Sequence, residues 1–346
     1  MNERLRDILI GSKRFLIIAS YADEDSLSSA VVLGKILNSE DTSADVIHFL
    51  PVSRHYQFIP FFDSIIALDP ADVDYGKYDT VITVDAASLK QIMDVRKAPT
   101  FAFPENIKTI SIDHHKGNTP FATFNFNDFE ASSTAELIYL YFIGLTDSPS
   151  YTLSKDEATA LLIGIMGDTG FLRWNMSARV LEVCKKLLEA GAEHFYVTNY
   201  LYYNRDKRLH EFLKEAIGKI EFFDDIRFML LTLNFADIQR MGIAKEDMHI
   251  FTRPYHEMFT DIYEGYDCGG ILIEEGERRV MGSLRGNPYA NKINLAELCK
   301  SMSEHGGGHP NSAGFVLCDN SVEYVKDMLI TKLRNIQVER KAKDGT

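Results

Sequence analysis

The segment "IKTISIDHH" (107–115) joins a buried strand to a polar end, and the fold can be worked out from it. Its apolar run stops at Asp113, His114 and His115, just before a turn at Gly117. Side chains alternate along a strand, but a twist at the strand end lets both histidines face one side. Two imidazoles beside a carboxylate are typical of a divalent-metal site. The same residues are also typical of a polar strand terminus.

Short apolar runs and helix-like patterns alternate over the first two hundred residues. "RFLIIAS" (14–20) predicts a buried strand, and "SLSSAVVLGKIL" (26–37) has apolar residues at helical spacing. Further strands are predicted at 45–50, 64–68 and 78–86, and further helices at 132–145, 154–166 and 177–190. This alternation favours an α/β fold with a mostly parallel sheet and helices on both faces.

A chain of 346 residues is longer than one hydrophobic core usually supports, so two domains are expected. The charged segment at 201–220 is helix-prone and is interpreted as a helical connector between them. New strand patterns and two helical patterns follow it, which indicate a smaller second α/β domain. We therefore predict a first domain at 1–200 and a second at 221–340, with a cleft between them.

The composition limits the partners and the compartment. The net charge of −13 makes the chain a poor candidate for binding long duplex DNA, although it permits binding of a short nucleotide or of divalent metals. The four cysteines are widely spaced and predict reduced thiols rather than a disulfide framework. The sequence has no signal-peptide pattern and no run of about 18 apolar residues. We expect a cytoplasmic protein without membrane attachment.

Carboxylates follow several of the predicted strands and one predicted helix. Asp23 and Asp25 come after the first strand, and Asp85 ends "VITVD". Asp168 lies between glycines in "GIMGDTG" (164–170), where the backbone is expected to come close to a ligand. Because the carboxyl ends of parallel strands meet at one edge of a sheet, these groups are expected to converge with the histidines at that edge.

The expected cluster has oxygen and imidazole ligands but no thiolate, which suits Mn²⁺ or Mg²⁺. Its carboxylates are numerous enough for two ions that share a ligand. Two such ions about 3.5–4 Å apart can clamp the attacking and leaving oxygens of a displacement at phosphorus. With water activated by the metal as the nucleophile, the pattern indicates phosphoryl hydrolysis.

A second signal lies near the C-terminus, in "SEHGGGHPNSAGF" (303–315). A run of glycines lets backbone N–H groups wrap an anion, and His309 adds a possible donor. Upstream, Arg285 in "MGSLRGN" has the planar fork that suits phosphate. Together they predict a phosphate- or nucleotide-binding surface on the second domain, although each alone is also typical of an exposed loop or strand end.

In this order, "DHH" (113–115), "ASSTAELI" (131–138), "GDTG" (167–170) and "GGGH" (306–309) resemble the DHH phosphoesterase superfamily. The resemblance runs from Asp23 to Gly314 and is greatest to the nanoRNase/pAp-phosphatase branch. It implies a Rossmann-like catalytic domain followed by a DHH-associated substrate-binding domain. It also implies a homodimer.

The resemblance further implies roles for individual residues. The implied metal ligands are Asp23, Asp25, Asp85, His114 and Asp168, with Asp85 bridging two ions. The implied catalytic residues are His115, which would meet the scissile phosphate, and Asp113, which would orient the histidines. The residues implied to bind substrate across the interdomain cleft are Asn118, Arg285, Gly307, Gly308 and His309.

One position departs from the family pattern. Where the family usually has a histidine for the first metal, this chain has Ala19, which has no donor atom. The first ion would therefore lose a ligand unless water, Ser20 or Tyr21 replaces it. The second set of ligands is intact.

The leading functional interpretation is a metal-dependent phosphodiesterase or phosphatase that uses two Mn²⁺ ions. Its substrates would be short oligoribonucleotides or 3′-phosphoadenosine 5′-phosphate. One alternative is a phosphodiesterase for a cyclic or linear dinucleotide of the c-di-AMP type. Another is a non-catalytic nucleotide-binding module that has lost a metal ligand at Ala19. An inorganic pyrophosphatase of the same superfamily is disfavoured by the "GGGH" segment.

Overall fold

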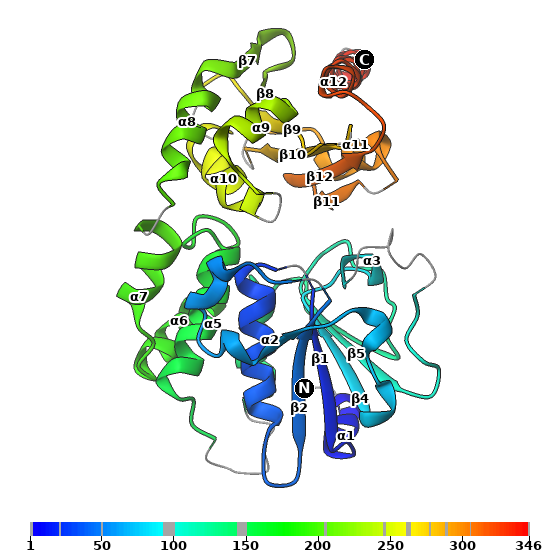
Figure 1. The fold of residues 1–346 in the computed structure, drawn as a ribbon, viewed down its shortest axis with the longest axis vertical. Coiled ribbons are helices and arrows are strands. Elements are labelled where there is room, and N and C mark those ends of the chain that lie inside the picture. Colours follow the sequence, from blue (N-terminus) through cyan, green and yellow to red (C-terminus); the bar gives the residue numbers. More distant parts are fainter. Residues whose placement is uncertain are drawn as a thin grey trace. The chain divides into compact units, whose positions relative to one another are not determined.

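The computed structural model describes residues 3–20, 22–49, 51–92, 101–143, 151–203, 206–244, 247–260, 264–276, 278–287, 290–304 and 306–344. The chain divides into two compact units, Met1–Arg205 and Asp206–Thr346. Each unit is built around its own six-stranded sheet (Figure 1). No helix within the described ranges combines the length and the apolar character that crossing a bilayer requires.

The sheet of the first unit is entirely parallel and has the strand order β3-β2-β1-β4-β5-β6. Its strands are β1 (Arg14–Ala19), β2 (Ser43–His48), β3 (Ile65–Ala67), β4 (Thr80–Val84), β5 (Lys108–Asp113) and β6 (Phe124–Asn127). This is the order of doubly wound α/β domains, and it confirms the predicted fold class. The direction of strand order reverses between β1 and β4, where such sheets form a crevice.

The register of the central strands brings three strand ends to one level. Ala19 of β1 pairs with Val84 of β4, and Val84 pairs with Ile112 of β5. The residues that follow these positions in the sequence therefore emerge side by side at the carboxyl edge. These are the residues for which the sequence predicts convergence.

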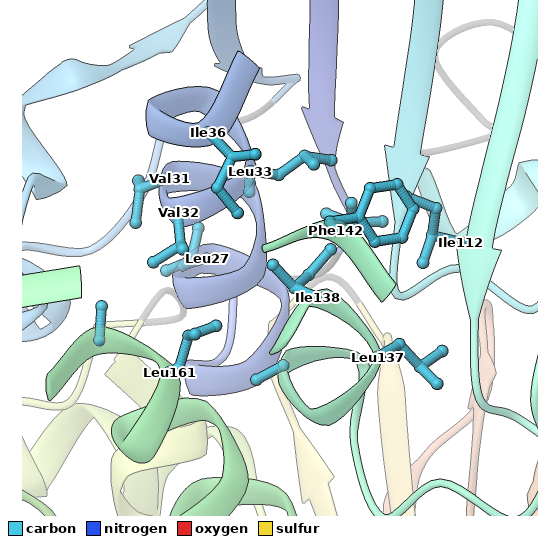
Figure 2. Packing of buried hydrophobic residues seen from close by; sticks show 14 of the residues in the cluster. Leu27, Val31, Val32, Leu33, Ile36, Ile112, Leu137, Ile138, Phe142 and Leu161 are labelled. Atoms are coloured by element: carbon cyan, nitrogen blue, oxygen red, sulfur yellow. The ribbon is translucent and has the colours of Figure 1, made fainter. Parts of the chain in front are cut away.

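Helices cover one face of this sheet. They include α2 (Glu24–Leu37), α4 (Thr134–Phe142), α5 (Lys155–Asp168), α6 (Ala178–Glu189) and α7 (His194–Thr198), together with α1 (Glu3–Ile10). Figure 2 shows Leu27 and Leu33 of α2 near Ile138 and Phe142 of α4, with Ile112 of the sheet beside them. This contiguous apolar core fixes the helix ends from which the polar cluster described below projects.

The other face is covered by shorter elements. Within the described ranges, it is covered by the short helix α3 (Leu89–Ile92), by 3₁₀ turns at Pro70–Asp72 and Tyr75–Lys77, and by loop aromatics such as Phe101 and Phe121. The connection from β3 to β4 is short, and its turns leave no room for a long helix.

The second unit has a mixed sheet in the order β11-β12-β10-β9-β8-β7, in which only the β8–β9 pair is parallel. Its strands are β7 (Ile220–Phe223), β8 (Phe228–Leu233), β9 (Cys268–Glu274), β10 (Val280–Gly286), β11 (Gly307–His309) and β12 (Ser312–Leu317). One face packs against α8 (Arg208–Lys219), α9 (Phe235–Met241) and α10 (Met248–Tyr255). The other packs against α11 (Leu295–Met302) and α12 (Val322–Asp344).

The predicted connector at 201–220 does not appear as a separate element. The division between the units falls after Arg205, and α8 buries Leu209, Phe212 and Ala216 in the core of the second unit. These residues lie on one side of a helix that also carries several charged residues, and that charge led the sequence analysis to treat the segment as a connector. The separate roles of the two units remain predictions.

Candidate metal centre

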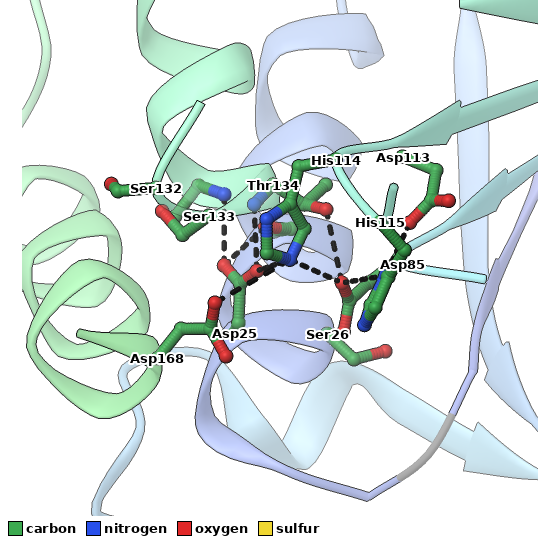
Figure 3. A network of polar contacts seen from close by, with 12 residues as sticks. Asp25, Ser26, Asp85, Asp113, His114, His115, Ser132, Ser133, Thr134 and Asp168 are labelled. Atoms are coloured by element: carbon green, nitrogen blue, oxygen red, sulfur yellow. Dashed lines mark hydrogen bonds and ion pairs between the residues drawn. The ribbon is translucent and has the colours of Figure 1, made fainter. Parts of the chain in front are cut away.

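The carboxyl edge of the first sheet gathers three carboxylates around one histidine (Figure 3). Asp25 lies in the first turn of α2, Asp85 follows β4, His114 follows β5, and Asp168 is the last residue of α5. His114 Nε2 lies 3.4 Å from Asp85 Oδ1, 3.4 Å from Asp168 Oδ2 and 3.9 Å from Asp25 Oδ2. Strands and helices that are far apart in sequence thus converge on a single imidazole nitrogen.

The geometry fits a divalent cation. His114 is only 6% exposed, and its Nε2 makes no hydrogen bond to any of the described residues. An unsatisfied buried ring nitrogen is costly, whereas a metal ion would satisfy it. Ligand atoms about 2.1 Å from an octahedral ion lie about 3–4 Å from one another, which matches the distances around Nε2. Oxygen donors with one imidazole suit Mn²⁺ or Mg²⁺.

The electrostatics of the cluster also call for positive charge. Burial, with Asp85 and Asp168 nearby, raises the pKa of Asp25 well above its usual value. Burial alone would lower the pKa of His114, but the carboxylates of Asp168, Asp85 and Asp25 raise it well above the usual range. Three acidic groups are thus balanced by a single buried imidazole. A bound cation would supply the missing charge.

Asp85 is held in an unusual backbone conformation. Its φ of 61° lies in the left-handed region, which is uncommon for a residue with a side chain. The hydroxyl of Ser20 donates to the Asp85 carbonyl oxygen, and the Asp85 amide donates to Ile112. Burial alone would raise the pKa of Asp85, but the neighbouring His114, His115 and Thr134 side chains lower it. A strained residue that is held from both sides is typical of a functional site.

His115 belongs to a second hydrogen-bonded group. Its Nδ1 lies 2.6 Å from Oδ1 of the fully buried Asp113, and Asn118 Nδ2 donates to Asp113 Oδ2 at 2.5 Å. His115 Nδ1 is also 3.7 Å from Asp85 Oδ1. The structure therefore places Asp113 where it can orient His115. Asn118 supports Asp113, and both hydrogens of its amide are used within the protein, the second by the Ala86 carbonyl.

Asp168 reaches the cluster from a helix rather than from a strand. It ends α5, where the helix dipole disfavours a carboxylate, so a nearby cation would compensate. The flanking glycines permit close packing, and the expected approach of backbone to ligand remains a prediction. A Cβ on Gly167 would lie 2.6 Å from Cβ of Glu24, and one on Gly170 would overlap the ring of Trp174.

Asp23 and Ala19 lie at the edge of this arrangement. Asp23 is the N-cap of α2, where its Oδ1 accepts from the Ser26 amide at 2.8 Å. Burial and the charge of Asp85 raise the pKa of Asp23 well above its usual value, so the two carboxylates interact. Ala19 is fully buried, and Tyr21 lies outside the described residues. The Ser20 hydroxyl donates to the Asp85 backbone.

The predicted phosphate-binding residues of the second unit share one sheet register. Ser312 of β12 pairs with Arg285 on one side and with His309 on the other. Gly307 and Gly308 lie in the short strand β11, where a loop was expected, and Gly308 has a φ of 133°. Arg285 NH1 donates to the Leu284 carbonyl and to Ser283 Oγ. The role of this group in substrate binding remains a prediction.

The sequence analysis did not predict a role for the start of α4 in this site. The hydroxyl and amide of Thr134 and the amide of Ala135 contact Asp85 and Asp25. The signal for a helix start was present, because Ser133 and Glu136 have capping-box spacing. That spacing predicts where a helix begins, but it does not show which distant carboxylate will meet the first turn.

Close helix packing beside Asp25 leads to a prediction for Gly164. A Cβ there would lie 2.8 Å from Ala135 Cβ and 3.1 Å from Asp25 Oδ1. We expect Gly164→Ala to push α5 away from α2 and α4, to lower the stability of the first unit by about 1–3 kcal/mol and to weaken metal binding. Thermal unfolding followed by circular dichroism checks this.

The matched control is Gly218→Ala in α8, where an added Cβ meets nothing within 4 Å. This change should be neutral or slightly stabilising, because alanine is the better helix former. Equal effects of the two substitutions would contradict the close-packing explanation.

Fold and site together define an α/β protein of the doubly wound class, with a candidate divalent-metal centre at the point where the strand order reverses. Residues 14–165 match the model of the DHH family, N-terminal domain. The first unit therefore contains a DHH-family domain, as the motifs in it predicted.

Two similar proteins illustrate the range of the relatives. A membrane protein–large ribosomal subunit bL9 fusion protein of Aster yellows witches'-broom phytoplasma (strain AYWB) is 24% identical over 344 residues, which cover 94% of this chain and 37% of that protein. The bifunctional oligoribonuclease and PAP phosphatase NrnA of Bacillus subtilis (strain 168) is 30% identical over 145 residues, which cover 41% of this chain and 44% of that protein. The chain thus spans less than half the length of these curated relatives.

Among solved structures, an exopolyphosphatase-related protein from Bacteroides fragilis superposes with a TM-score of 0.79 at 19% identity, over 96% of each chain. This likeness shows that the two proteins share a fold over both units.

Proposed function

We propose that this protein is a metal-dependent phosphoric ester hydrolase that acts on short oligoribonucleotides or on 3′-phosphoadenosine 5′-phosphate. The observation that carries the proposal is the buried Nε2 of His114, which faces three carboxylates without a hydrogen bond. The match to the DHH family over the same unit supports it. The name of the Bacillus subtilis relative supports the choice of substrates. The charge of −13 favours substrates with few phosphates.

We propose that Mn²⁺ is the working ion, with Mg²⁺ as a substitute. Asp25, Asp85, His114 and Asp168 would hold one ion, and Asp23 with the shared Asp85 would hold a second. Bound there, such ions neutralise phosphate charge and lower the pKa of water. His115, oriented by Asp113, would donate a hydrogen bond to the phosphate. The cytoplasmic location and the homodimer remain predictions.

The direct test measures product release with and without Mn²⁺. Wild-type protein should release mononucleotide from a labelled RNA dinucleotide, or phosphate from 3′-phosphoadenosine 5′-phosphate, only when the metal is present. A parallel assay with c-di-AMP distinguishes the dinucleotide-signal alternative. The absence of hydrolysis of all three substrates at any Mn²⁺ concentration would contradict the proposed enzyme.

Metal binding can be measured independently of activity through Trp174, the only tryptophan in the sequence. Its indole N–H donates to the carbonyl oxygen of Asp168 at 2.8 Å. Paramagnetic Mn²⁺ bound at Asp168 should therefore quench the fluorescence of Trp174, whereas diamagnetic Mg²⁺ should not. Competition between the two metals, seen as recovery of the fluorescence when Mg²⁺ is added, then reports the affinity of the site for Mg²⁺.

A specific observation also keeps the nucleotide-binding module as a second candidate. Ala19 is fully buried beside Val84 at the end of β1 and offers no ligand atom for the ion proposed at Asp23. A module of this kind would bind Mn²⁺ and nucleotide but release no product. Metal stoichiometry and product release by the wild-type protein separate the two candidates. Hydrolysis that appears only in Ala19→His would identify the module, since the wild-type protein would then be inactive for want of one ligand.

A further inference from the structure

The first turn of α4 makes direct contact with the candidate metal centre. Asp25 Oδ2 accepts a hydrogen bond from the Thr134 amide at 2.6 Å, and Asp25 Oδ1 accepts one from the Ala135 amide at 2.8 Å. Amides at a helix start have no partner within the helix, and the helix dipole favours an anion there. The side chain of Asp25 is therefore fixed in position by a helix more than a hundred residues away in the sequence.

Thr134 also contacts the second carboxylate. Its hydroxyl donates to Asp85 Oδ1 at 3.1 Å, and the whole residue is buried. The two oxygens that Thr134 contacts, Asp25 Oδ2 and Asp85 Oδ1, are the same two that lie nearest His114 Nε2 in their carboxylates (Figure 3). A single residue thus orients oxygens from α2 and from the end of β4 toward one nitrogen.

We infer that Thr134 is a positioning residue that sets the metal affinity of this protein by holding the carboxylates of Asp25 and Asp85 in place. The inference rests on the proposed function, because it assumes that these carboxylates bind a metal. A carboxylate oxygen has two lone-pair sites, so each oxygen can accept from Thr134 and still face the cation. Without the hydroxyl, Asp85 Oδ1 can rotate away from His114.

The test compares three substitutions at this position by Mn²⁺ quenching of Trp174 fluorescence. Thr134→Val keeps the shape but removes the hydroxyl, and we expect Mn²⁺ affinity to fall about 10- to 100-fold, as for other groups that hold a ligand. Thr134→Ser keeps the hydroxyl and should stay within about threefold of wild type.

Thr134→Pro removes both the hydroxyl and the N–H, and it should bind Mn²⁺ more weakly than the valine variant. Proline is well tolerated at the first position of a helix. The preceding Ser133 already has the extended conformation that proline requires, with a φ of −163° and a ψ of 162°. Thermal unfolding without metal should show that the variants remain folded.

Thr83→Val is the matched control, because Thr83 is also buried and the hydrogen bond that its hydroxyl donates to the Ile110 carbonyl is long, at 3.4 Å. It should leave Mn²⁺ quenching unchanged. Wild-type affinity in Thr134→Val would overturn the inference while leaving the metal centre intact. A wild-type protein that shows no Mn²⁺ quenching would overturn the proposed function, and the inference with it. Equal losses of Mn²⁺ affinity in Thr134→Ser and Thr134→Val would overturn the inference about Thr134, because the hydroxyl would then be irrelevant.

Discussion

Replacing His114 by alanine should abolish both Mn²⁺ quenching of Trp174 and Mn²⁺-dependent hydrolysis. The substitution removes the one nitrogen that faces Asp25, Asp85 and Asp168, at 3.4–3.9 Å from their oxygens. Loss of a group that merely orients a ligand typically costs about 10- to 100-fold in affinity or activity, so loss of the ligand itself should exceed about 100-fold. Initial rates and a fluorescence titration on the same preparation measure both effects.

The control is His194→Ala, since His194 is an exposed histidine of α7 in the same unit. It should retain wild-type activity and quenching. Activity of His114→Ala within tenfold of wild type would contradict the assignment of His114 as a ligand. Loss of activity with full retention of Mn²⁺ quenching would instead move its role from the metal to the substrate.

Replacing Arg179 by leucine should be the most destabilising change in the first unit among those considered. Arg179 Nε donates to Glu136 Oε1 at 2.6 Å, and its NH1 donates to Asp128 Oδ2 at 2.9 Å. Glu136 is completely buried, so removal of the guanidinium leaves a charge without its partner. Removing one partner of a fully buried ion pair costs about 3–5 kcal/mol. Because the Arg179 side chain is 33% exposed, we expect a loss at the lower end, of about 3 kcal/mol.

The same change should weaken metal binding, because Glu136 also accepts from the amide and hydroxyl of Ser132, next to the first turn of α4.

Urea unfolding of the metal-free protein, followed by Trp174 fluorescence, reports the first unit specifically. Lys185→Leu on the same helix is the control, because its ion pair with Glu182 is exposed and contributes about 1 kcal/mol at most. The double variant Arg179→Leu, Glu136→Leu should recover part of the loss. Equal midpoints for Arg179→Leu and Lys185→Leu would refute the argument from burial.

The sequence predicts the parallel sheet and its polar edge because both depend on local patterns. An apolar run that ends in an aspartate identifies a strand and its exit residue at once, as at Asp85 and Asp113. The helices at 26–37, 154–166 and 177–190 agree with the structure because helical spacing and caps are also local signals. Short elements are less predictable: "FNFN" in β6 is only four residues long and was not recognised.

The support of the site could not be predicted, because it depends on which distant segments meet. Nothing near Thr134 in the sequence indicates that its amide will reach Asp25 or that its hydroxyl will reach Asp85. In the sequence, Arg179 likewise looks like an ordinary surface residue of a helix, because only the packing of α6 against α4 brings it to Glu136. Asp168 was expected at the turn after the predicted helix 154–166, and it is the last residue of that helix in the structure. The close packing of Gly167 on Glu24 just before it could not be predicted.

The wide separation of Asp25, Asp85, His114 and Asp168 along the chain has a consequence for folding. Because the four side chains meet only through long-range contacts, no short fragment of the chain presents the complete site, and the unfolded chain has no comparable affinity for the ion. Binding energy is then added to the stability of the whole first unit, by an amount that grows with the ratio of free metal to the dissociation constant. The metal would act as a reversible cross-link between the first and last thirds of this unit, and its supply in the cell would help to determine how long the folded protein survives.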